Sequence, residues 1–196
     1  MEHKGTKRLE TERLLLRPFR ESDGEAMFRN WANDPEVCRY LTWGPHETVN
    51  DSRGIAALWA SRSGEPAFYQ WAIELKELGE PIGSISVVRR DDTVAAAEIG
   101  YCIGRRWWGS GLTPEALRAV VRYLITEVGV NRVSARHDVG NPNSGRVMRK
   151  AGMTAEGVLR AAGRNNQGVV DMAVYSILAK EFYEQQAGGR ANAQAD

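Results

Sequence analysis

A strand, a glycine-containing loop, a long amphipathic helix and a second strand follow one another in the middle of this chain. Residues 95–103 and 132–138 have the apolar patterns of strands. Between them, apolar side chains recur at steps of three and four residues: Leu117, Val120, Val121, Leu124, Ile125 and Val128. Thr113 and Pro114 favour a helix start, and Gly129 favours its end. Such a succession predicts a crossover between two parallel strands.

The segments on either side alternate between further strands and helices. The predicted strands lie at residues 14–17, 68–75, 81–88, 154–160 and 169–178, and the predicted helices at residues 22–32, 47–62 and 143–151. Short polar breaks separate the strands between residues 68 and 103, as in an antiparallel meander. We therefore expect a mixed, mostly antiparallel sheet of about seven strands with helices on both faces, an α/β (α+β) fold.

Length and composition fit one soluble domain. The chain has 196 residues, of which 42% are hydrophobic and 26% charged, so it can bury a sizeable core. We expect the domain to span residues 9–183. A flexible start at residues 1–8 precedes it, and a flexible tail at residues 184–196 follows, ending in low-complexity sequence.

Charge and cysteine usage exclude several classes of function. The net charge is +1, so no basic field indicates a nucleic-acid partner. The polar start is not a signal peptide, and no apolar run approaches the ~20 residues of a membrane span. Cys38 and Cys102 lack the spacing of a disulfide framework or a zinc site. We therefore expect a cytoplasmic protein without a metal, acting as a monomer or homodimer.

The loop ahead of the long helix carries the chemistry. Gly109 and Gly111 stand where the backbone turns into the helix, and glycine lets successive N–H groups point into one concavity. Because the helix adds its dipole and its first-turn donors, the sequence predicts a phosphate or pyrophosphate site. No GxxxxGK[ST] pattern occurs, and no third glycine completes a dinucleotide fingerprint after Gly111. The loop is therefore neither a Walker nor a Rossmann loop.

A six-residue pattern in this loop resembles a known family. Arg106-x-x-Gly109-x-Gly111 is similar to the [Q/R]xxGx[G/A] loop of the GCN5-related N-acetyltransferases (GNAT). From Glu10 to Lys180 the chain resembles the branch that contains the ribosomal-protein alanine acetyltransferases. The segments that carry this likeness are residues 11–17, 82–83, 97–101, 108–111, 113–116, 150–152 and 156–157, with Asn141, Ser144, Asp171 and Tyr175. The resemblance implies a GNAT fold with a splayed central strand pair, and acetyl-coenzyme A (acetyl-CoA) as co-substrate.

The resemblance also implies positions for the coenzyme. Backbone groups of Tyr101, Cys102 and Ile103 would bind the pantetheine arm like an added strand. The loop residues beside the pyrophosphate would be Arg106, Trp108, Gly109, Ser110, Gly111, Leu112 and Thr113. Asn141 and Ser144 would contact the coenzyme near its sulfur. The residues alone leave structural alternatives open, because tryptophans pack beside loops and Asn141 or Ser144 can cap a helix.

The reaction implied is attack of a neutral amine on a thioester. An α-amine has an unperturbed pKa of about 7.7–8.0, so a base or a desolvated pocket must supply the neutral form. Glu98 is the candidate base, acting through water, and an ordinary ion pair is its structural alternative. Ser144 is the candidate acid for the leaving thiolate. Two positions depart from the family pattern: Met148 replaces a general-acid tyrosine, and Gly163 stands where some ribosomal-protein acetyltransferases carry a glutamate.

The acceptor wall is expected from the first two helices, their connecting loop and the last hairpin. The candidate acceptor contacts are Trp31, Tyr40, Trp43, Arg164 and Tyr175. Their aromatic rings either grip an apolar or cationic acceptor or seal the core. The favoured function is acetylation of a protein N-terminus of the ribosomal-protein type. The alternatives are acetylation of a small amine, such as an antibiotic, polyamine or amino acid, and an acyl-CoA-binding module without turnover.

Overall fold

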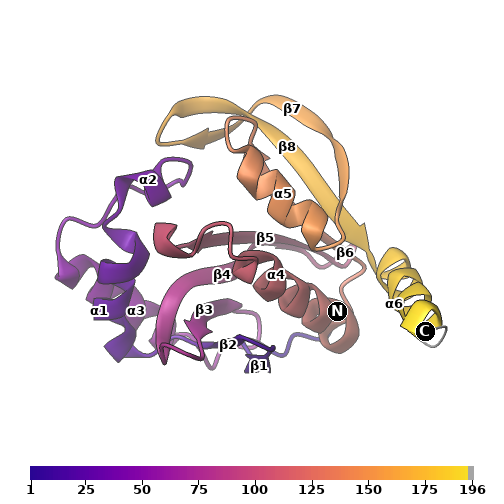
Figure 1. Cartoon of the computed structure of the whole chain (residues 1–196), viewed down its shortest axis with the longest axis horizontal. Coiled ribbons are helices and arrows are strands. Elements are labelled where there is room, and N and C mark those ends of the chain that lie inside the picture. The colour runs from indigo at the N-terminus through magenta and orange to yellow at the C-terminus, as the bar shows by residue number, and fades with distance from the viewer. Residues whose placement is uncertain (194–196) are drawn as a thin grey trace.

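One sheet of eight strands forms the centre of the molecule (Figure 1). The structure is a computed structural model that describes residues 1–193. The strands are β1 (Leu9–Glu10), β2 (Leu14–Pro18), β3 (Gln70–Leu75), β4 (Glu80–Asp91), β5 (Ala96–Ile103), β6 (Arg132–Asp138), β7 (Thr154–Asn165) and β8 (Gly168–Leu178). Their order is β1-β2-β3-β4-β5-β6-β8-β7, and only β5 and β6 pair in parallel. The predicted mixed, mostly antiparallel sheet is confirmed.

Helices lie on both faces of this sheet. They are α1 (Gly24–Met27), α2 (Pro35–Cys38), α3 (Val49–Ser61), α4 (Leu112–Tyr123), α5 (Pro142–Lys150) and α6 (Ala179–Ala193). A π-helical turn, Phe28–Ala32, follows α1, and another, Leu124–Val128, extends α4. Among the described residues, no helix combines the length and apolar character needed to cross a bilayer.

Alternation along β3 shows how the two faces are built. Trp71 and Ile73 are fully buried in the larger core, beneath α4, while Ala72 between them joins a second core with Trp31 and Ala56. Successive side chains of a strand point to opposite faces, so one strand supplies both cores. The predicted placement of helices on both faces is confirmed.

Several element boundaries differ from the sequence expectation. The sequence predicts a last-but-one strand ending at residue 160, whereas β7 continues to Asn165. Register shifts at Ala155/Gly157 and Leu159/Gly163 break its two-residue alternation, so the sequence pattern does not predict residues 161–165 as part of the strand. The short β1 and α2 are too brief to show a period.

The C-terminal segment is helical where the sequence predicts a tail. Helix α6 starts directly after β8 and includes the first ten residues of the expected flexible tail. Residues 194–196 of that tail lie outside the described residues. Phe182, on the first turns of α6, is buried in the main core and gives the helix its anchor.

The parallel strands separate halfway along their length. Pairing between β5 and β6 runs from Ala96↔Arg132 to Ile99↔Ala135 and then stops. The rest of β5 stays paired with β4, while the end of β6 stays paired with β8. The predicted splayed pair is therefore confirmed, and we call this opening the fork, bounded by residues 100–103 and 136–138.

Candidate functional site

The loop at the start of α4 has the shape that its glycines predict. Gly109 has φ +77° and Gly111 has φ +82°, in the left-handed region that favours glycine. Within the described part of the chain, the backbone N–H groups from Gly109 to Thr113 donate no hydrogen bond to the protein. Five successive free donors at the N-terminus of a twelve-residue helix form a site for an anion.

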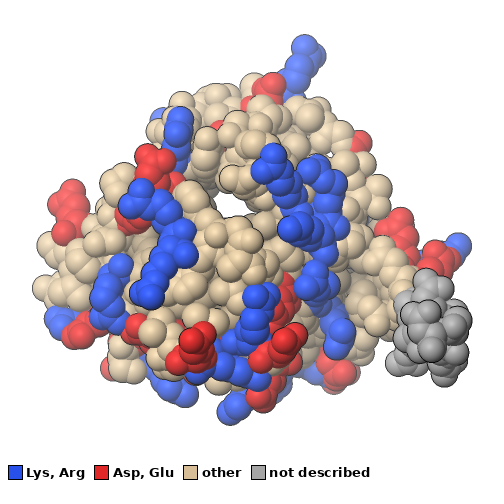
Figure 2. Space-filling model, in the orientation of Figure 1, with Lys and Arg blue, Asp and Glu red and all other residues tan. Residues whose placement is uncertain are grey.

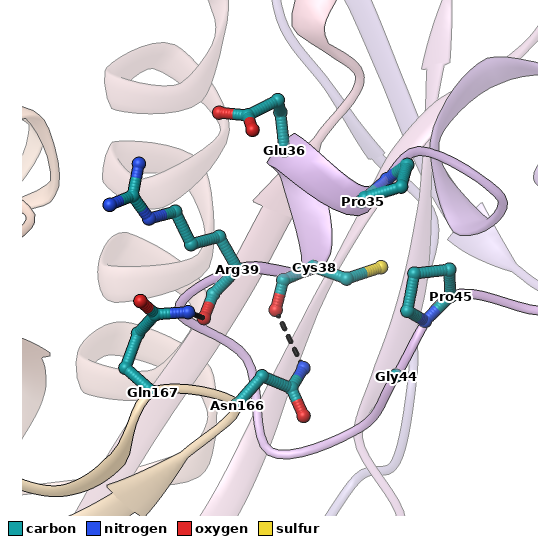
Figure 3. Close-up of a pocket in the computed structure, with 8 residues that line it drawn as sticks. All are labelled: Pro35, Glu36, Cys38, Arg39, Gly44, Pro45, Asn166 and Gln167. Carbon is teal, nitrogen blue, oxygen red and sulfur yellow. Dashed lines mark hydrogen bonds between the residues drawn. The ribbon is translucent and has the colours of Figure 1, made fainter.

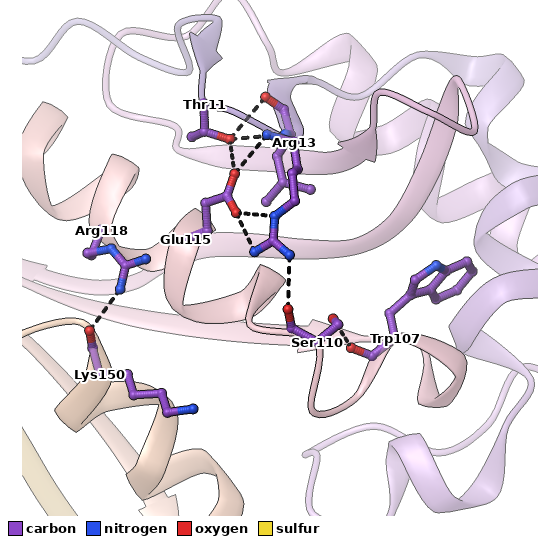
Figure 4. Close-up of polar contacts among 8 residues, drawn as sticks. Thr11, Arg13, Trp107, Ser110, Glu115, Arg118 and Lys150 are labelled. Atoms are coloured by element: carbon purple, nitrogen blue, oxygen red, sulfur yellow. Dashed lines mark hydrogen bonds and ion pairs between the residues drawn. The ribbon is translucent and has the colours of Figure 1, made fainter.

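Glu115, one turn into α4, ties this loop to the β1–β2 turn (Figure 4). Its carboxylate accepts from Thr11 Oγ1 at 2.6 Å and from the Arg13 backbone N–H at 3.0 Å. The Arg13 guanidinium pairs with the same carboxylate at 2.6 Å and donates to the Ser110 carbonyl at 3.0 Å. Burial would raise the pKa of Glu115, but the hydrogen bonds from Thr11 and Arg13 outweigh it and hold the pKa below its usual value.

The two tryptophans of the loop differ in their surroundings. Trp107 packs against the main core, and the Arg106 guanidinium lies 5.6 Å from its ring centroid. Trp108 is 48% exposed, and its Nε1–H donates to the Ile103 carbonyl at 2.9 Å. Trp107 therefore has the packing role, whereas Trp108 presents an indole face beside the anion site.

Exposed basic side chains lie along α4, the helix that follows the anion site, and along α5. Figure 2 shows Lys and Arg gathered over both helices. They include Arg118, Arg122, Arg146, Arg149 and Lys150. Arg118 also donates to the Lys150 carbonyl at 2.8 Å and so holds the two helices together (Figure 4). This positive surface suits the phosphates of a coenzyme.

One edge of β5 is open along the fork, except at the Ile103 carbonyl, which already accepts from Trp108 Nε1. The Gly104 N–H donates to the Ile82 carbonyl of β4, and in an antiparallel pair such bonds recur at every second residue. The backbone groups of Cys102 therefore face β4, and those of Tyr101 and Ile103 face the fork. The expectation that Cys102 offers backbone groups to the coenzyme is corrected by this register.

Tyr101 and Ser144 meet across the fork. The Tyr101 phenol lies 2.9 Å from Ser144 Oγ and donates to the Ser144 carbonyl at 3.1 Å. Asn141 is the N-cap of α5 and accepts from the Ser144 N–H at 3.4 Å, so the structural alternative for Asn141 is present. Burial raises the pKa of Tyr101 above its ordinary value, which keeps the phenol protonated.

Glu98 points to the opposite face of β5 from Tyr101. Its carboxylate accepts from Arg136 Nε at 2.9 Å and has Arg89 Nε at 3.8 Å. Its side chain is only 17% exposed. The ion-pair alternative is therefore present, and any role as base requires the carboxylate to work beside two guanidinium groups.

Burial and close packing surround the two residues that depart from the family pattern, Met148 and Gly163. Met148 is 1% exposed and belongs to the main core, so its position offers no polar group to the fork. At Gly163, a Cβ would lie 2.4 Å from the sulfur of Met172, so no side chain fits there without movement.

Two of the predicted acceptor contacts are corrected by their burial. Trp31 is fully buried in the second core and seals it. Tyr175 is 6% exposed, packs in the main core on the α5 side, and accepts from Arg149 Nη1 at 2.7 Å. Tyr40 and Trp43 are half-buried and Arg164 is exposed, so these three stay available to a ligand.

The tip of the β7–β8 hairpin is hydrogen-bonded to the segment that follows α2. Asn166 Nδ2 donates to the carbonyls of Cys38 at 2.9 Å and Trp43 at 2.7 Å, and its N–H donates to the Leu41 carbonyl at 3.1 Å. We call this connection, residues 38–43 with residues 165–168, the arch. Figure 2 shows an opening in the molecule below the hairpin, between α2 and α5.

Two cavities flank the arch. One of about 380 Å³ is drawn in Figure 3 and is lined by Pro35, Glu36, Cys38, Arg39, Gly44, Pro45, Asn166 and Gln167. A second of about 690 Å³ is lined by Thr42 and residues 164–168. Residues of the α2 loop and of the last hairpin, the segments predicted to form the acceptor wall, line both cavities together.

Comparison with known proteins identifies the class that this fold and site define. Residues 13–154 match the family model described as "Acetyltransferase (GNAT) domain". The chain is 30% identical over 174 residues to "Uncharacterized N-acetyltransferase p20" of Bacillus licheniformis, covering 89% of this chain and 97% of that protein. The chain therefore belongs to the GNAT family of N-acetyltransferases.

Relatives with named acceptors and a solved neighbour give further context. The "[Ribosomal protein uS5]-alanine N-acetyltransferase" of Escherichia coli (strain K12) is 29% identical over 161 residues, 76% of this chain and 79% of that protein. The structure of the microcin C7 self immunity acetyltransferase MccE in complex with acetyl-CoA and AMP superposes with a TM-score of 0.76 at 20% identity, covering 86% and 93% of the two chains. The latter likeness concerns the fold alone.

Sequence reasoning missed the residues that hold the site together. Arg13 and Glu115 belong to two segments of the family likeness, and their 2.6 Å ion pair joins these segments in the fold. No local sequence pattern predicts the contacts of Asn166 with Cys38 or of Asp138 with Asn165, because these partners lie far apart in the chain.

Proposed function

We propose that this protein transfers the acetyl group of acetyl-CoA to a primary amine. The observation that carries the proposal is the row of free N–H groups from Gly109 to Thr113 beside the free edge of β5. The first suits a diphosphate, and the second suits an amide-bearing arm that extends the strand. In support, MccE, a protein of this fold, was solved with acetyl-CoA.

The residues of the fork suggest how the transfer proceeds. The amine nitrogen bonds to the thioester carbon and loses a proton, through water, to the proposed base Glu98; the C–S bond breaks, and the leaving thiolate takes a proton. Free N–H groups of Tyr101 and Ile103 on the fork are placed to donate to the developing oxyanion. The hydroxyl pair of Tyr101 and Ser144 is the proton source we propose for the thiolate, because both groups are protonated at neutral pH.

We propose a protein N-terminal α-amine as the acceptor and the cytoplasm as the compartment. The naming of the E. coli relative as a ribosomal-protein alanine acetyltransferase supports this choice. A small amine is the second candidate, favoured by the cavities of about 380 and 690 Å³, whose volumes are of the size that drug-like molecules occupy.

The test combines binding and turnover. Calorimetry with acetyl-CoA should give a saturable isotherm, and release of free thiol should follow addition of an acceptor. The panel contains peptides that begin with Ala or Ser, the same peptides with blocked N-termini, and spermidine, lysine and an aminoglycoside. Turnover of free peptides alone supports the proposal, and turnover of a small amine alone selects the second candidate. Binding without any turnover would instead favour the module without catalysis.

Glu98 is the proposed base, and its replacement tests the role directly. Glu98→Gln keeps the shape of the side chain but removes the charge. General-base assistance contributes about 10²–10⁴-fold to a rate, so kcat should fall by at least a hundredfold while the acetyl-CoA Kd stays unchanged. Arg89→Gln, which removes only the longer 3.8 Å contact, is the control and should change kcat little. Equal kcat values for Glu98→Gln and the native protein would assign Glu98 to the ion pair alone.

A further inference from the structure

Asp138, the last residue of β6, is a buried carboxylate at the fork. The residue is 8% exposed. Its Oδ1 accepts from the Gly140 N–H and its Oδ2 from Asn165 Nδ2, both at 2.7 Å. Both donors are neutral, and they occupy two of the roughly four lone-pair positions that a carboxylate offers.

Asp138 has no cationic partner within 4.0 Å among the described side chains. The other buried acid, Asp23, is 4% exposed and pairs with Arg17 at 2.7 Å. Glu98, in the paired part of β5, pairs with Arg136. Burying a carboxylate without a counter-charge costs free energy. A cation that enters the site and pairs with Asp138 would offset part of this cost.

The surroundings of Asp138 belong to the proposed acceptor wall. Asn165 lies in the tip of the hairpin and lines the second cavity. A Cβ added at Gly140 would lie 3.2 Å from Asp138 Oδ1 and 3.6 Å from Cε1 of Tyr40, so the Tyr40 ring lies within about 7 Å of the carboxylate. Alternation along β6 turns Asp138 away from Val133 and Ala135, which face the main core.

We infer that Asp138 binds the ammonium group of the acceptor and so selects amines that are cationic before they react. This inference rests on the proposed function and adds the acceptor chemistry to it. The Arg39 guanidinium already lies 5.3 Å from the centroid of the Tyr40 ring, so a cation–π contact with the acceptor would use the other face of the ring. The coenzyme site lies on the side of α4 and α5, so the acceptor approaches the fork from beneath the arch.

Two acceptors of nearly the same shape, one with a charged and one with an uncharged terminal amine, test the inference. Ala-Gly-Gly amide carries an ammonium group at pH 7, whereas its aza-alanine analogue, with nitrogen in place of Cα, has an uncharged terminal amine. Asp138→Asn should lower the ratio of kcat/KM for Ala-Gly-Gly amide to that for the analogue by about ten- to a hundredfold, the effect of losing a hydrogen bond to a charged group. The Kd for acetyl-CoA should not change.

The ratio separates charge recognition from a structural effect. Asp171→Asn is the matched control. Like Asp138, Asp171 accepts a hydrogen bond from a backbone N–H, that of Ala161, and it lies in the β7–β8 hairpin that also contains Asn165. Asn165→Ala removes a neutral donor to Asp138 but keeps the Asp138 charge. Asp171→Asn and Asn165→Ala should therefore both keep the native ratio of the two kcat/KM values. Equal losses for both acceptors in Asp138→Asn, or an unchanged ratio, would overturn the inference while leaving the proposed function in place. If the native protein binds acetyl-CoA but acetylates neither peptide, the acceptor proposal and the inference both fail.

Discussion

At the scale of single residues, Glu115 fixes the geometry of the anion site. It joins Thr11 and Arg13 to the first turn of α4, and its side chain is 12% exposed. We expect Glu115→Gln to lower the free energy of unfolding by about 1–3 kcal/mol at pH 7, because donors of Arg13 lose a charged acceptor. Urea unfolding measures this loss, and Glu127→Gln on the exposed side of the same helical segment should change little.

The pH dependence of that loss follows from the lowered pKa of Glu115. The folded protein holds the pKa below the ordinary 4.5, so it binds fewer protons than the unfolded chain. The stabilisation is therefore complete above the unfolded pKa and disappears as the pH falls through the folded one. The free energies of unfolding of Glu115→Gln and the native protein should therefore converge as the pH falls below 4.5 and through the lowered pKa of the folded state. A difference that stays constant from pH 7 to pH 3 would mean that the charge of Glu115 contributes nothing.

Gly111 tests the loop conformation by a pair of substitutions. A β-branched residue at φ +82° is strained, whereas Asn tolerates the left-handed region. We expect Gly111→Val to weaken acetyl-CoA binding by at least tenfold and Gly111→Asn to weaken it much less. Calorimetry gives both Kd values. Equal affinities for the Val variant and the native protein would remove Gly111 from the coenzyme site.

At the scale of elements, the arch depends on the three hydrogen bonds of Asn166. Removal of the side chain in Asn166→Ala leaves the carbonyls of Cys38 and Trp43 without this donor. We expect the acceptor KM to rise several-fold while the acetyl-CoA Kd stays the same, because the proposed coenzyme site lies on the side of α4 and α5, away from the arch. Gln167→Ala loses only a 3.5 Å contact with the Arg39 carbonyl and should be close to neutral. A changed coenzyme affinity in Asn166→Ala would contradict the separation of the two sites.

The elements also show which features a sequence can predict. Helix α4 and strands β5 and β6 follow from local periodicity, and the glycine loop follows from its place between them. The register that turns Cys102 toward β4 follows from its pairing with Ser84, which no local pattern contains. The burial of Trp31 and Tyr175 likewise depends on tertiary packing, and the contact between residues 38–43 and 165–168 joins segments more than a hundred residues apart in the chain.

At the scale of the whole molecule, the proposed coenzyme site joins three separate parts of the fold. Its loop is anchored to the β1–β2 turn through Glu115, its free edge belongs to β5, and Ser144 comes from α5. A ligand bound across these parts favours the folded state alone. Acetyl-CoA at a hundred times its Kd should therefore stabilise the protein by about 2.7 kcal/mol.

For a chain of this length, that stabilisation raises the Tm by about 5–10 °C. Differential scanning fluorimetry with and without acetyl-CoA measures the rise, and free adenosine monophosphate, which lacks the diphosphate and the arm, serves as the control ligand. Gly111→Val should lose at least about half of the shift at the same coenzyme concentration, because a tenfold higher Kd leaves about 1.4 kcal/mol of the stabilisation. A Tm that acetyl-CoA leaves unchanged in the native protein would show that the loop and the fork do not act as one binding site.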